Sequence, residues 1–198
     1  SLVISEERKL PAYTQIRLEC GADLVLTHGQ VGNITIKASQ NMAPYVITEV
    51  SSGVLTVKMS PDFAYQFTKK LEICIPVDNS LTEIAVHGSG DISSHEQLQV
   101  KNLSCKVLGS GDMLLSLQAE SLSFSVKGSG DMKIKGITQD LSVDIAGSGD
   151  FDGDALQAKQ ATASIRGSGD VDLFVTEQLS ADIRGSGDIT VKGNPKKI

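Results

Sequence analysis

The residues best suited to chemistry are six aspartates, one at the end of each copy of a Gly-Ser-Gly-Asp tetrapeptide. The first glycines of successive copies are 21, 19, 19, 20 and 18 residues apart, which is a solenoid-like period. A repeat of this kind would align the aspartates in one column with a neighbouring serine column. The two columns comprise Ser89, Asp91, Ser110, Asp112, Ser129, Asp131, Ser148, Asp150, Ser168, Asp170, Ser186 and Asp188.

Such an aspartate column needs a partner for its negative charge. Carboxylates about 4.8 Å apart repel by roughly 0.9 kcal/mol per pair in water, and by more where the effective dielectric constant is lower. Backbone N–H groups at the corner could offset this repulsion, and bound cations are the alternative. We favour the N–H groups, because one column supplies too few oxygens for each calcium ion. The outward columns are therefore a candidate binding surface, with no metal predicted.

Other sequences that could bind ions or catalyse reactions are incomplete. Asp150–Asp154 resembles the start of a calcium loop but lacks the later glutamate, so a solvated turn is the better interpretation. His28, His87 and His95 are scattered, and neither zinc-ligand spacing nor a serine–histidine pair is present. No phosphate-binding loop precedes a helix. The sequence predicts no catalytic residue, cofactor or metal site, and no enzyme.

The segments around each tetrapeptide alternate like β-strands. In the third copy Leu122, Phe124 and Val126 precede the tetrapeptide and Met132 and Ile134 follow it, all at even positions. The alternation predicts that both glycines face inward at a sharp corner, where no side chain fits, while Ser and Asp face outward. The corner glycines are Gly88, Gly90, Gly109, Gly111, Gly128, Gly130, Gly147, Gly149, Gly167, Gly169, Gly185 and Gly187.

Stacked strands of this period predict an all-β fold, a parallel β-solenoid (β-helix) with about 19–20 residues per coil. The alternative is an antiparallel meander in which each tetrapeptide is a hairpin loop. Breaks in the alternation, such as Leu117 to Leu122, predict looser turns. The residues predicted to lie inside are Leu103, Val107, Leu122, Phe124, Val126, Leu141, Val143, Ile145, Ile165 and Ile183.

We expect one domain over residues 1–198. Residues 1–80 are expected to be irregular coils that cap one end, residues 81–192 six regular coils, and residues 193–198 a tail. Ile16–Leu26 reads as a degenerate coil. A short helix is expected within Ser39–Val50, and strands at Val54–Met59 and Lys70–Ile75 flank a polar loop around Ser60–Asp62.

Composition limits the function classes. A net charge of -6 disfavours nucleic acid or an anionic membrane as a partner. No apolar run approaches the roughly 18 residues of a membrane helix. Cys20, Cys74 and Cys105 have no paired spacing, so buried thiols are expected. The first residues lack the features of a signal peptide, which leaves open whether a leader has been removed.

The repeated Gly-Ser-Gly-Asp, each followed by Ile, Met, Phe or Val, resembles the family described as putative auto-transporter adhesin, head GIN domain. The resemblance covers about Tyr13 to Lys192. It implies a right-handed parallel β-helix on an exported protein of the Bacteroidetes type, located in the periplasm, in the outer membrane or at the cell surface. No catalytic residues come with it.

Two function classes follow. The first is a non-catalytic, exported binding or adhesion module that presents a solenoid face to a protein or glycan on a cell surface. The alternative is a structural β-helix that self-associates end to end, as bactofilins do. A polysaccharide-active β-helix enzyme is a distant third.

Overall fold

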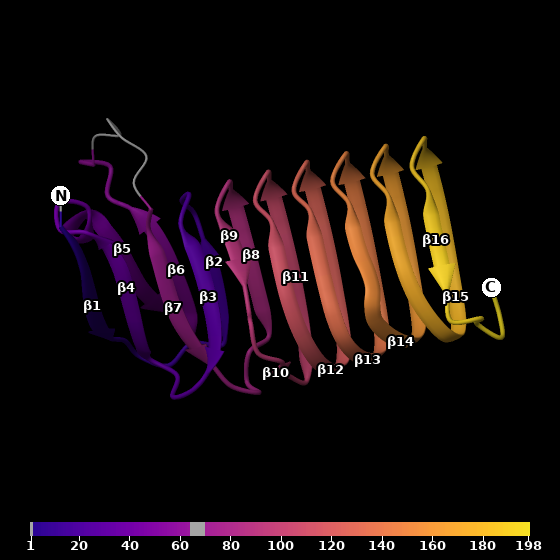
Figure 1. The fold of residues 1–198 in the computed structure, drawn as a ribbon, viewed down its shortest axis with the longest axis horizontal. Helices are drawn as coiled ribbons and strands as arrows, with labels where there is room; N and C mark the ends of the chain where they lie inside the picture. The colour runs from indigo at the N-terminus through magenta and orange to yellow at the C-terminus, as the bar shows by residue number, and fades with distance from the viewer. Residues whose placement is uncertain (1, 64–69) are drawn as a thin grey trace.

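The computed structural model describes residues 2–63 and 70–198, and its strands wind into a β-solenoid (Figure 1). Apart from a 3₁₀ turn at Ala43–Tyr45, which lies within the segment expected to be helical, the described residues form no helix. No helix among these residues is long and apolar enough to cross a membrane. The predicted all-β solenoid is confirmed.

The regular coils are long strands that pair in parallel with their successors. Met113 lies opposite Met132, and Gly128 lies opposite Gly147, so like residues stack on like. This register excludes the antiparallel meander for the regular coils, because the tetrapeptides join stacked coils and close no hairpins. The strands are β11 (Asn102–Gly109), β12 (Met113–Gly128), β13 (Met132–Gly147), β14 (Phe151–Gly167) and β15 (Val171–Gly185).

The expected loose turns between the tetrapeptides are bends within continuous strands. In β12 and β13, Gln118 pairs with Ile137 and Ser121 pairs with Asp140, across the segment where the alternation breaks. Successive coils bend at the same place, so their backbone N–H and C=O groups still meet. The alternation therefore locates each bend correctly, but the prediction of a loop there is wrong.

The core follows the inward positions of every coil. Nine of the ten residues predicted to lie inside are at most 3% exposed. Ile183 is the exception at 42%, because it belongs to the last coil of the stack and no coil covers it. Cys105 is buried, Cys20 and Cys74 are half-buried, and all three cysteines are free thiols.

The degenerate coil is confirmed. Its strands β2 (Gln15–Leu18) and β3 (Asp23–His28) pair in parallel with β8 (Glu83–Gly88) and β9 (Asp91–Ser93), and Asp23 lies opposite Asp91. On their other side, β2 and β3 pair in parallel with β6 (Val54–Met59) and β7 (Glu72–Val77). A coil formed by residues early in the sequence therefore lies between two coils formed by later residues.

The N-terminal end departs from the coil pattern. Strand β1 (Val3–Lys9) pairs antiparallel with β4 (Asn33–Ser39), and β5 (Val46–Ser51) pairs antiparallel with β6. Strand β4 also runs antiparallel to β7. Residues 1–80 therefore combine one degenerate coil with antiparallel strands at the end of the stack. For β5 and β6 the cause is a tight turn in which Ser52 and Gly53 have φ of 49° and 76°, so the chain reverses at once.

Strand β6 (Val54–Met59) matches its prediction, and β7 (Glu72–Val77) is shifted slightly along the chain. The polar loop expected around Ser60–Asp62 is a turn, in which the Asp62 N–H donates to the Ser60 hydroxyl oxygen at 3.2 Å, and residues 64–69 of the same connection lie outside the described residues. Strand β10 (Leu98–Gln99) pairs with β12, and β16 (Ile189–Lys192) pairs with β15. Strand β16 is thus the last strand that continues the parallel stack.

Candidate functional site

The two glycines of each tetrapeptide have different roles, so the expectation that both face inward is wrong for the first. Gly128 is exposed and has φ of 127°, a conformation that residues with a side chain rarely adopt. Gly130 is buried, and a Cβ added to it would lie 2.1 Å from the carbonyl oxygen of Gly111 on the preceding coil. The first glycine is needed for its backbone conformation, and the second for the close approach of two coils.

The predicted aspartate column exists, and it is a hydrogen-bonded ladder. The backbone N–H of each aspartate donates to Oδ1 of the aspartate one coil earlier. The distances are 2.9 Å for Asp112 to Asp91, 2.8 Å for Asp131 to Asp112, 2.9 Å for Asp150 to Asp131, 2.8 Å for Asp170 to Asp150 and 3.0 Å for Asp188 to Asp170. Backbone N–H groups therefore offset the carboxylate charge, as the sequence predicted.

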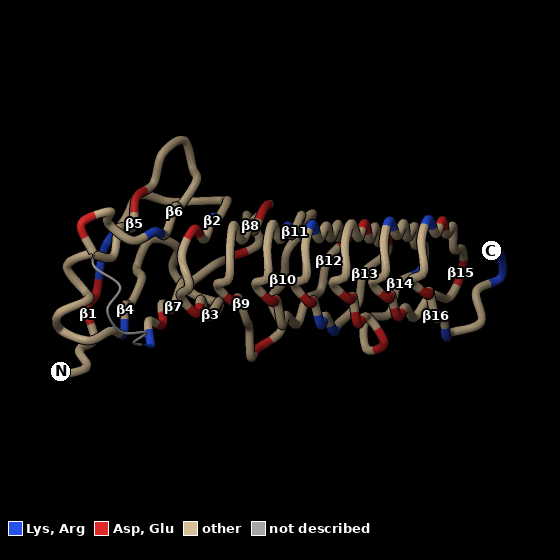
Figure 2. The backbone as a smooth tube through the Cα atoms, turned by 90° about the horizontal axis from the view of Figure 1, so that it is seen from above, with Lys and Arg blue, Asp and Glu red and all other residues tan. Residues whose placement is uncertain are grey.

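The ladder replaces a bond that the corner disrupts. In a regular parallel pair, the N–H of Asp131 would meet the carbonyl of Gly111. That carbonyl instead occupies the space where a side chain of Gly130 would be. The Asp112 carboxylate accepts the N–H in its place, so the aspartates have a structural role (Figure 2 shows acidic residues recurring along the coils).

The serine column is exposed and lies beside the ladder. The backbone N–H groups of these serines bond to the glycine carbonyls of the preceding coil, for example Ser129 to Gly109 at 3.1 Å. Among the described residues, the six serine hydroxyls form no hydrogen bond to the protein. Four of the column aspartates, Asp91, Asp112, Asp131 and Asp150, also line a groove of about 520 Å³. Both columns are accessible to a partner.

Because N–H groups already stabilise the column, we expect calcium to be unnecessary for folding. The unfolding midpoint measured by circular dichroism should be the same, within about 1 °C, in calcium and in chelator. A control with magnesium separates a specific calcium effect from ionic strength. A calcium-dependent rise of several degrees would contradict this expectation.

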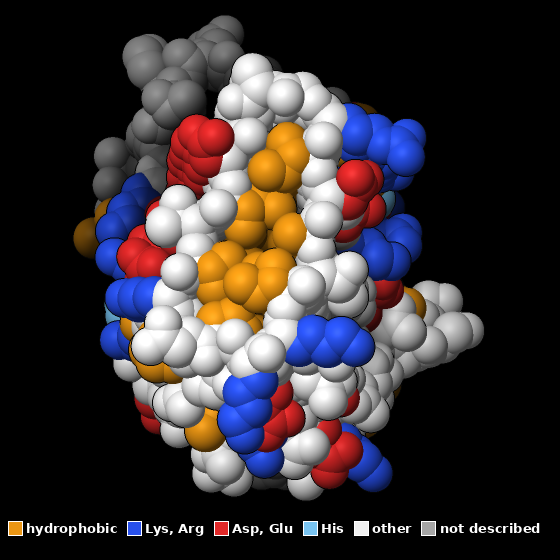
Figure 3. All heavy atoms as spheres, turned by 90° about the vertical axis from the view of Figure 1, so that its right-hand side faces the viewer, with side chains coloured by type: hydrophobic (Ala, Val, Ile, Leu, Met, Phe, Trp, Pro, Cys, Tyr) orange, Lys and Arg blue, Asp and Glu red, His pale blue; other side chains and the backbone are white. Residues whose placement is uncertain are grey.

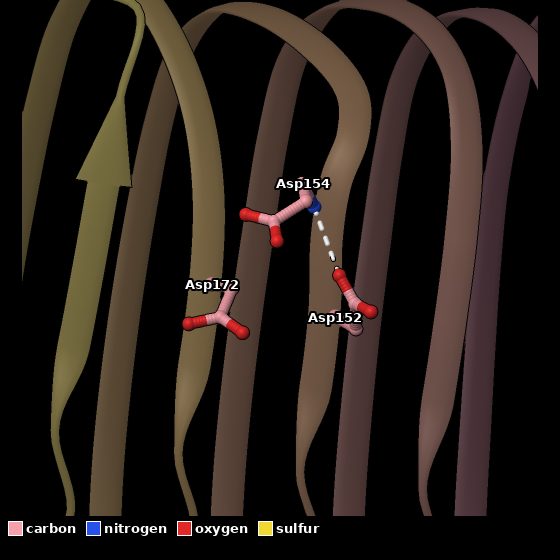
Figure 4. A group of neighbouring side chains, drawn as sticks. All are labelled: Asp152, Asp154 and Asp172. Atoms are coloured by element: carbon pink, nitrogen blue, oxygen red, sulfur yellow. Dashed lines mark hydrogen bonds between the residues drawn. The ribbon is translucent and has the colours of Figure 1, made fainter.

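A second acidic cluster combines Asp152 and Asp154 of β14 with Asp172 of β15. Carboxylate oxygens of the three lie within 4.8 Å of one another, and the Asp154 N–H donates to Asp152 Oδ1 at 3.1 Å (Figure 4). Lys192 Nζ lies 3.9 Å from Asp154 Oδ1. Burial, followed by the negative charges of Asp154 and Asp152, raises the pKa of Asp172. The sequence predicts a solvated turn at Asp150–Asp154, but all of these residues except Asp150 belong to strand β14.

The raised pKa predicts that Asp172→Asn stabilises the protein at neutral pH. The folded state holds the Asp172 proton more tightly than the unfolded state, so ionisation costs stability as the pH rises above the unfolded pKa of about 3.9. The variant should melt about 1–3 °C higher at pH 7, and at about pH 3 the difference should vanish. Melting curves across this pH range test it.

Asp78 provides a control, because its pKa is shifted in the opposite direction to that of Asp172. Ser80 donates its hydroxyl and its N–H to Asp78, and these bonds lower the Asp78 pKa. Asp78→Asn should therefore lower the melting temperature at pH 7. If Asp78→Asn and Asp172→Asn changed the melting temperature at pH 7 in the same direction, the conclusion that ionised Asp172 destabilises the fold would be contradicted.

A third feature is a groove of about 580 Å³ that crosses the outer face of β11 to β15. We call it the hydroxyl groove. One row along it is Ser104, Ser123, Ser142, Thr162 and Ser180, and a second is Asn102, Ser121, Asp140, Gln160 and Gln178. Between the rows lie the buried Leu103, Leu122, Leu141 and Ala161. Four coil spacings make it roughly 19 Å long.

The hydroxyl groove offers hydrogen bonds and almost no charge. Among the described residues that line it, Asp140 is the one ionisable residue, and none is a histidine or cysteine. General acid–base catalysis of glycoside cleavage usually needs two carboxyl groups, so the lining suits binding better than hydrolysis. Sequence reasoning missed this site, because it considered the tetrapeptides and not the rows beside them. Aligning the repeats on Gly-Ser-Gly-Asp places Ser104, Ser123 and Ser142 at one position, and that signal could have found it.

Solved structures share this fold. A putative adhesin from Bacteroides fragilis superposes with a TM-score of 0.85 at 21% identity, covering 96% of this chain and 97% of that one. A putative lipid binding protein from Parabacteroides distasonis gives 0.73 at 21%, covering 96% of each chain. A putative adhesin from Parabacteroides merdae gives 0.73 at 18%, covering 99% of this chain and 91% of that one.

A search of curated proteins finds no match. The family model described as putative auto-transporter adhesin, head GIN domain, matches residues 12–195, nearly the whole chain. Its span agrees with the resemblance carried by the tetrapeptides. The chain therefore belongs to the putative auto-transporter adhesin, head GIN domain family.

Proposed function

We propose that this adhesin-like protein is a non-catalytic, exported module that binds a protein or glycan on a cell surface through the hydroxyl groove. The observation that carries the proposal is the continuous pair of polar rows over five strands. Ser123, Ser142 and Thr162 are exposed, and their hydroxyls form no hydrogen bond to described protein groups. They can donate to and accept from an extended partner without first breaking a bond in the protein.

The chemistry of the groove sets the class of partner. Its walls are hydroxyls and amides, so it suits a polar and largely uncharged chain. A single contact of this kind is weak, because hydrogen bonds to the ligand replace bonds to water. Firm attachment therefore requires several copies acting together. The serine column at the corner is a second polar surface and needs a separate test.

The experiment uses beads coated with purified protein and measures their attachment to bacterial and host cells. The double variant Ser123→Arg, Ser142→Arg fills the groove with long charged side chains and should reduce attachment at least about tenfold. Ser129→Arg, Ser148→Arg introduces the same change in the serine column and should attach normally. Protease or glycosidase treatment of the target cells then identifies the partner as protein or glycan.

Location is tested separately, by fractionating the native cells and detecting the protein with an antibody. Recovery in the periplasm, in the outer membrane or on the cell surface supports the exported module. Wild-type beads that fail to attach, or equal attachment by the groove and corner variants, contradict binding through the groove. A chain confined to the cytoplasm and forming end-to-end filaments in electron micrographs favours the structural polymer instead.

A further inference from the structure

The C-terminal end of the solenoid leaves core positions uncovered. Ile145 and Ile165 are 0% exposed because the next coil covers each of them, whereas Ile183 at the same register is 42% exposed. Ile189 and Val191 of β16 are only half-buried, and Ala181 is exposed. Figure 3 looks onto this end and shows an apolar patch at its centre with charged side chains around it.

The backbone edge at this end is also open. In the coil before, Gly167 presents its carbonyl to the N–H groups of Ser186 and Gly187 on the coil that follows. The equivalent Gly185 faces the open end. The tail covers only a neighbouring stretch, where Lys197 accepts from the Leu179 N–H and donates to the Glu177 carbonyl. Among the described residues, none pairs with the outer edge of residues 180–185.

We propose that this C-terminal end binds the same end of a second copy of the chain, forming a dimer with a two-fold axis through Ile183. Two identical ends that face each other are related by an axis perpendicular to the solenoid, and this rotation reverses the strand direction. The open edges of β15 therefore meet antiparallel, although neighbouring coils within one chain are parallel. The apolar patches of the two copies then cover each other.

The charges of β15 select the register. With Ile183 on the axis, Asp182 of each copy lies opposite Arg184 of the other. Moving the axis by one residue would place Asp182 against Asp182, or Arg184 against Arg184. The chain already contains the favourable contact between neighbouring coils, because Asp144 and Arg166 occupy the same two positions and form an ion pair of 3.7 Å. The Ile183 register repeats this contact between two chains.

The N-terminal end does not offer an equivalent partner. It is formed by the antiparallel strands β1 and β5, so it does not present another parallel coil. The expected assembly is therefore a closed dimer and not a filament. An end of about 25 by 20 Å would bury on the order of 1,000 Å² in total, which is small for a stable dimer. We expect a dissociation constant in the micromolar range.

Analytical ultracentrifugation of the full chain over a range of concentrations tests the proposal. Asp182 and Arg184 have side chains that are 65% and 78% exposed, so changing them should leave the fold intact, which circular dichroism checks. Asp182→Arg places arginines opposite arginines, and Arg184→Asp places aspartates opposite aspartates. Each should weaken dimerisation at least about tenfold.

An equal mixture of the two single variants restores the opposite charges, and so does the double variant Asp182→Arg, Arg184→Asp. Both should dimerise like wild type. The mixture is the decisive case, because Asp182 and Arg184 also form an ion pair of 3.4 Å within one chain, and the double variant restores that pair as well. For the apolar patch, Ile183→Lys should abolish the dimer. Ile137→Lys is the matched control, since Ile137 is 48% exposed and lies away from this end, and should leave the dimer unchanged.

Three results would overturn the proposal. One is a wild-type monomer at every concentration up to the solubility limit. Another is a dimer that the single charge variants do not weaken. The last is open-ended filaments, which would mean that the C-terminal end binds a different surface of the next copy.

Discussion

Gly130→Val should destabilise the protein by about 3 kcal/mol or more, which is a large effect for a single substitution. The valine Cβ would lie 2.1 Å from the Gly111 carbonyl oxygen and 2.9 Å from Val107 Cγ1. Relief would require the two coils to separate, which would weaken the pairing along the corner. Thermal and urea unfolding measure the loss, and Ser129→Ala, at the exposed neighbouring position, should change the melting temperature little.

The first glycines allow the two causes of strain to be separated. Gly88 has φ of 119°, and no atom lies within 4 Å of a Cβ added there, so Gly88→Ala tests backbone conformation alone. Gly128 has φ of 127°, and its added Cβ would also lie 2.4 Å from the Gly109 carbonyl oxygen. Gly128→Ala should therefore cost more than Gly88→Ala. Equal losses at Gly130, Gly128 and Ser129 would refute this account of the corner.

The second large effect concerns the aspartate ladder. Asp131→Ala removes the oxygen that accepts the Asp150 N–H at 2.9 Å, and the corner offers that N–H no replacement carbonyl. A lost hydrogen bond to a charged acceptor costs about 1.5–3 kcal/mol, and relief of repulsion along the column offsets part of it. We expect a net loss of about 1–2 kcal/mol and a melting temperature lower by roughly 3–7 °C.

Asp131→Asn is the matched variant, because its amide oxygen can still accept the Asp150 N–H while the charge is removed. It should unfold within about 0.5 kcal/mol of wild type. If the asparagine variant were as unstable as the alanine variant, the carboxylate charge and not the hydrogen bond would be essential. That result would favour the alternative in which a cation bound along the column balances the carboxylate charge.

The repeat made the coils predictable. Alternation through Leu122, Gly130 and Met132 requires a strand that turns a corner without changing its inward face, and the constant period then stacks like residues. Alternation also predicted the nine buried core residues. It could not reveal the left-handed conformation of Gly128, because residue type alone does not distinguish a glycine needed for φ from one needed for space.

Other features depend on what lies next to a residue. Ile183 has the pattern of a core residue, but its burial requires a following coil that the pattern cannot supply. Strand β4 alternates like any coil strand, so its antiparallel direction is set by the path of the chain. The hydroxyl groove is visible only when Ser104 and Ser123 are aligned by coil. Local alternation therefore predicts strands better than it predicts their neighbours.

The position of the β2–β3 coil has a consequence for how the chain folds as it emerges from a ribosome or a translocation channel. This coil forms from residues 15–28, but its parallel partners are β6 and β7 on one side and β8 and β9 on the other. An isolated coil has nothing to pair with, so this coil must wait for β6 and β7, which are complete at Val77, and its second side must wait for β9, which ends at Ser93. Further strands can then pair with the β2–β3 coil on both of its sides. One end is closed by β1, β4 and β5, and the other adds the regular coils one at a time, in the order in which they are made.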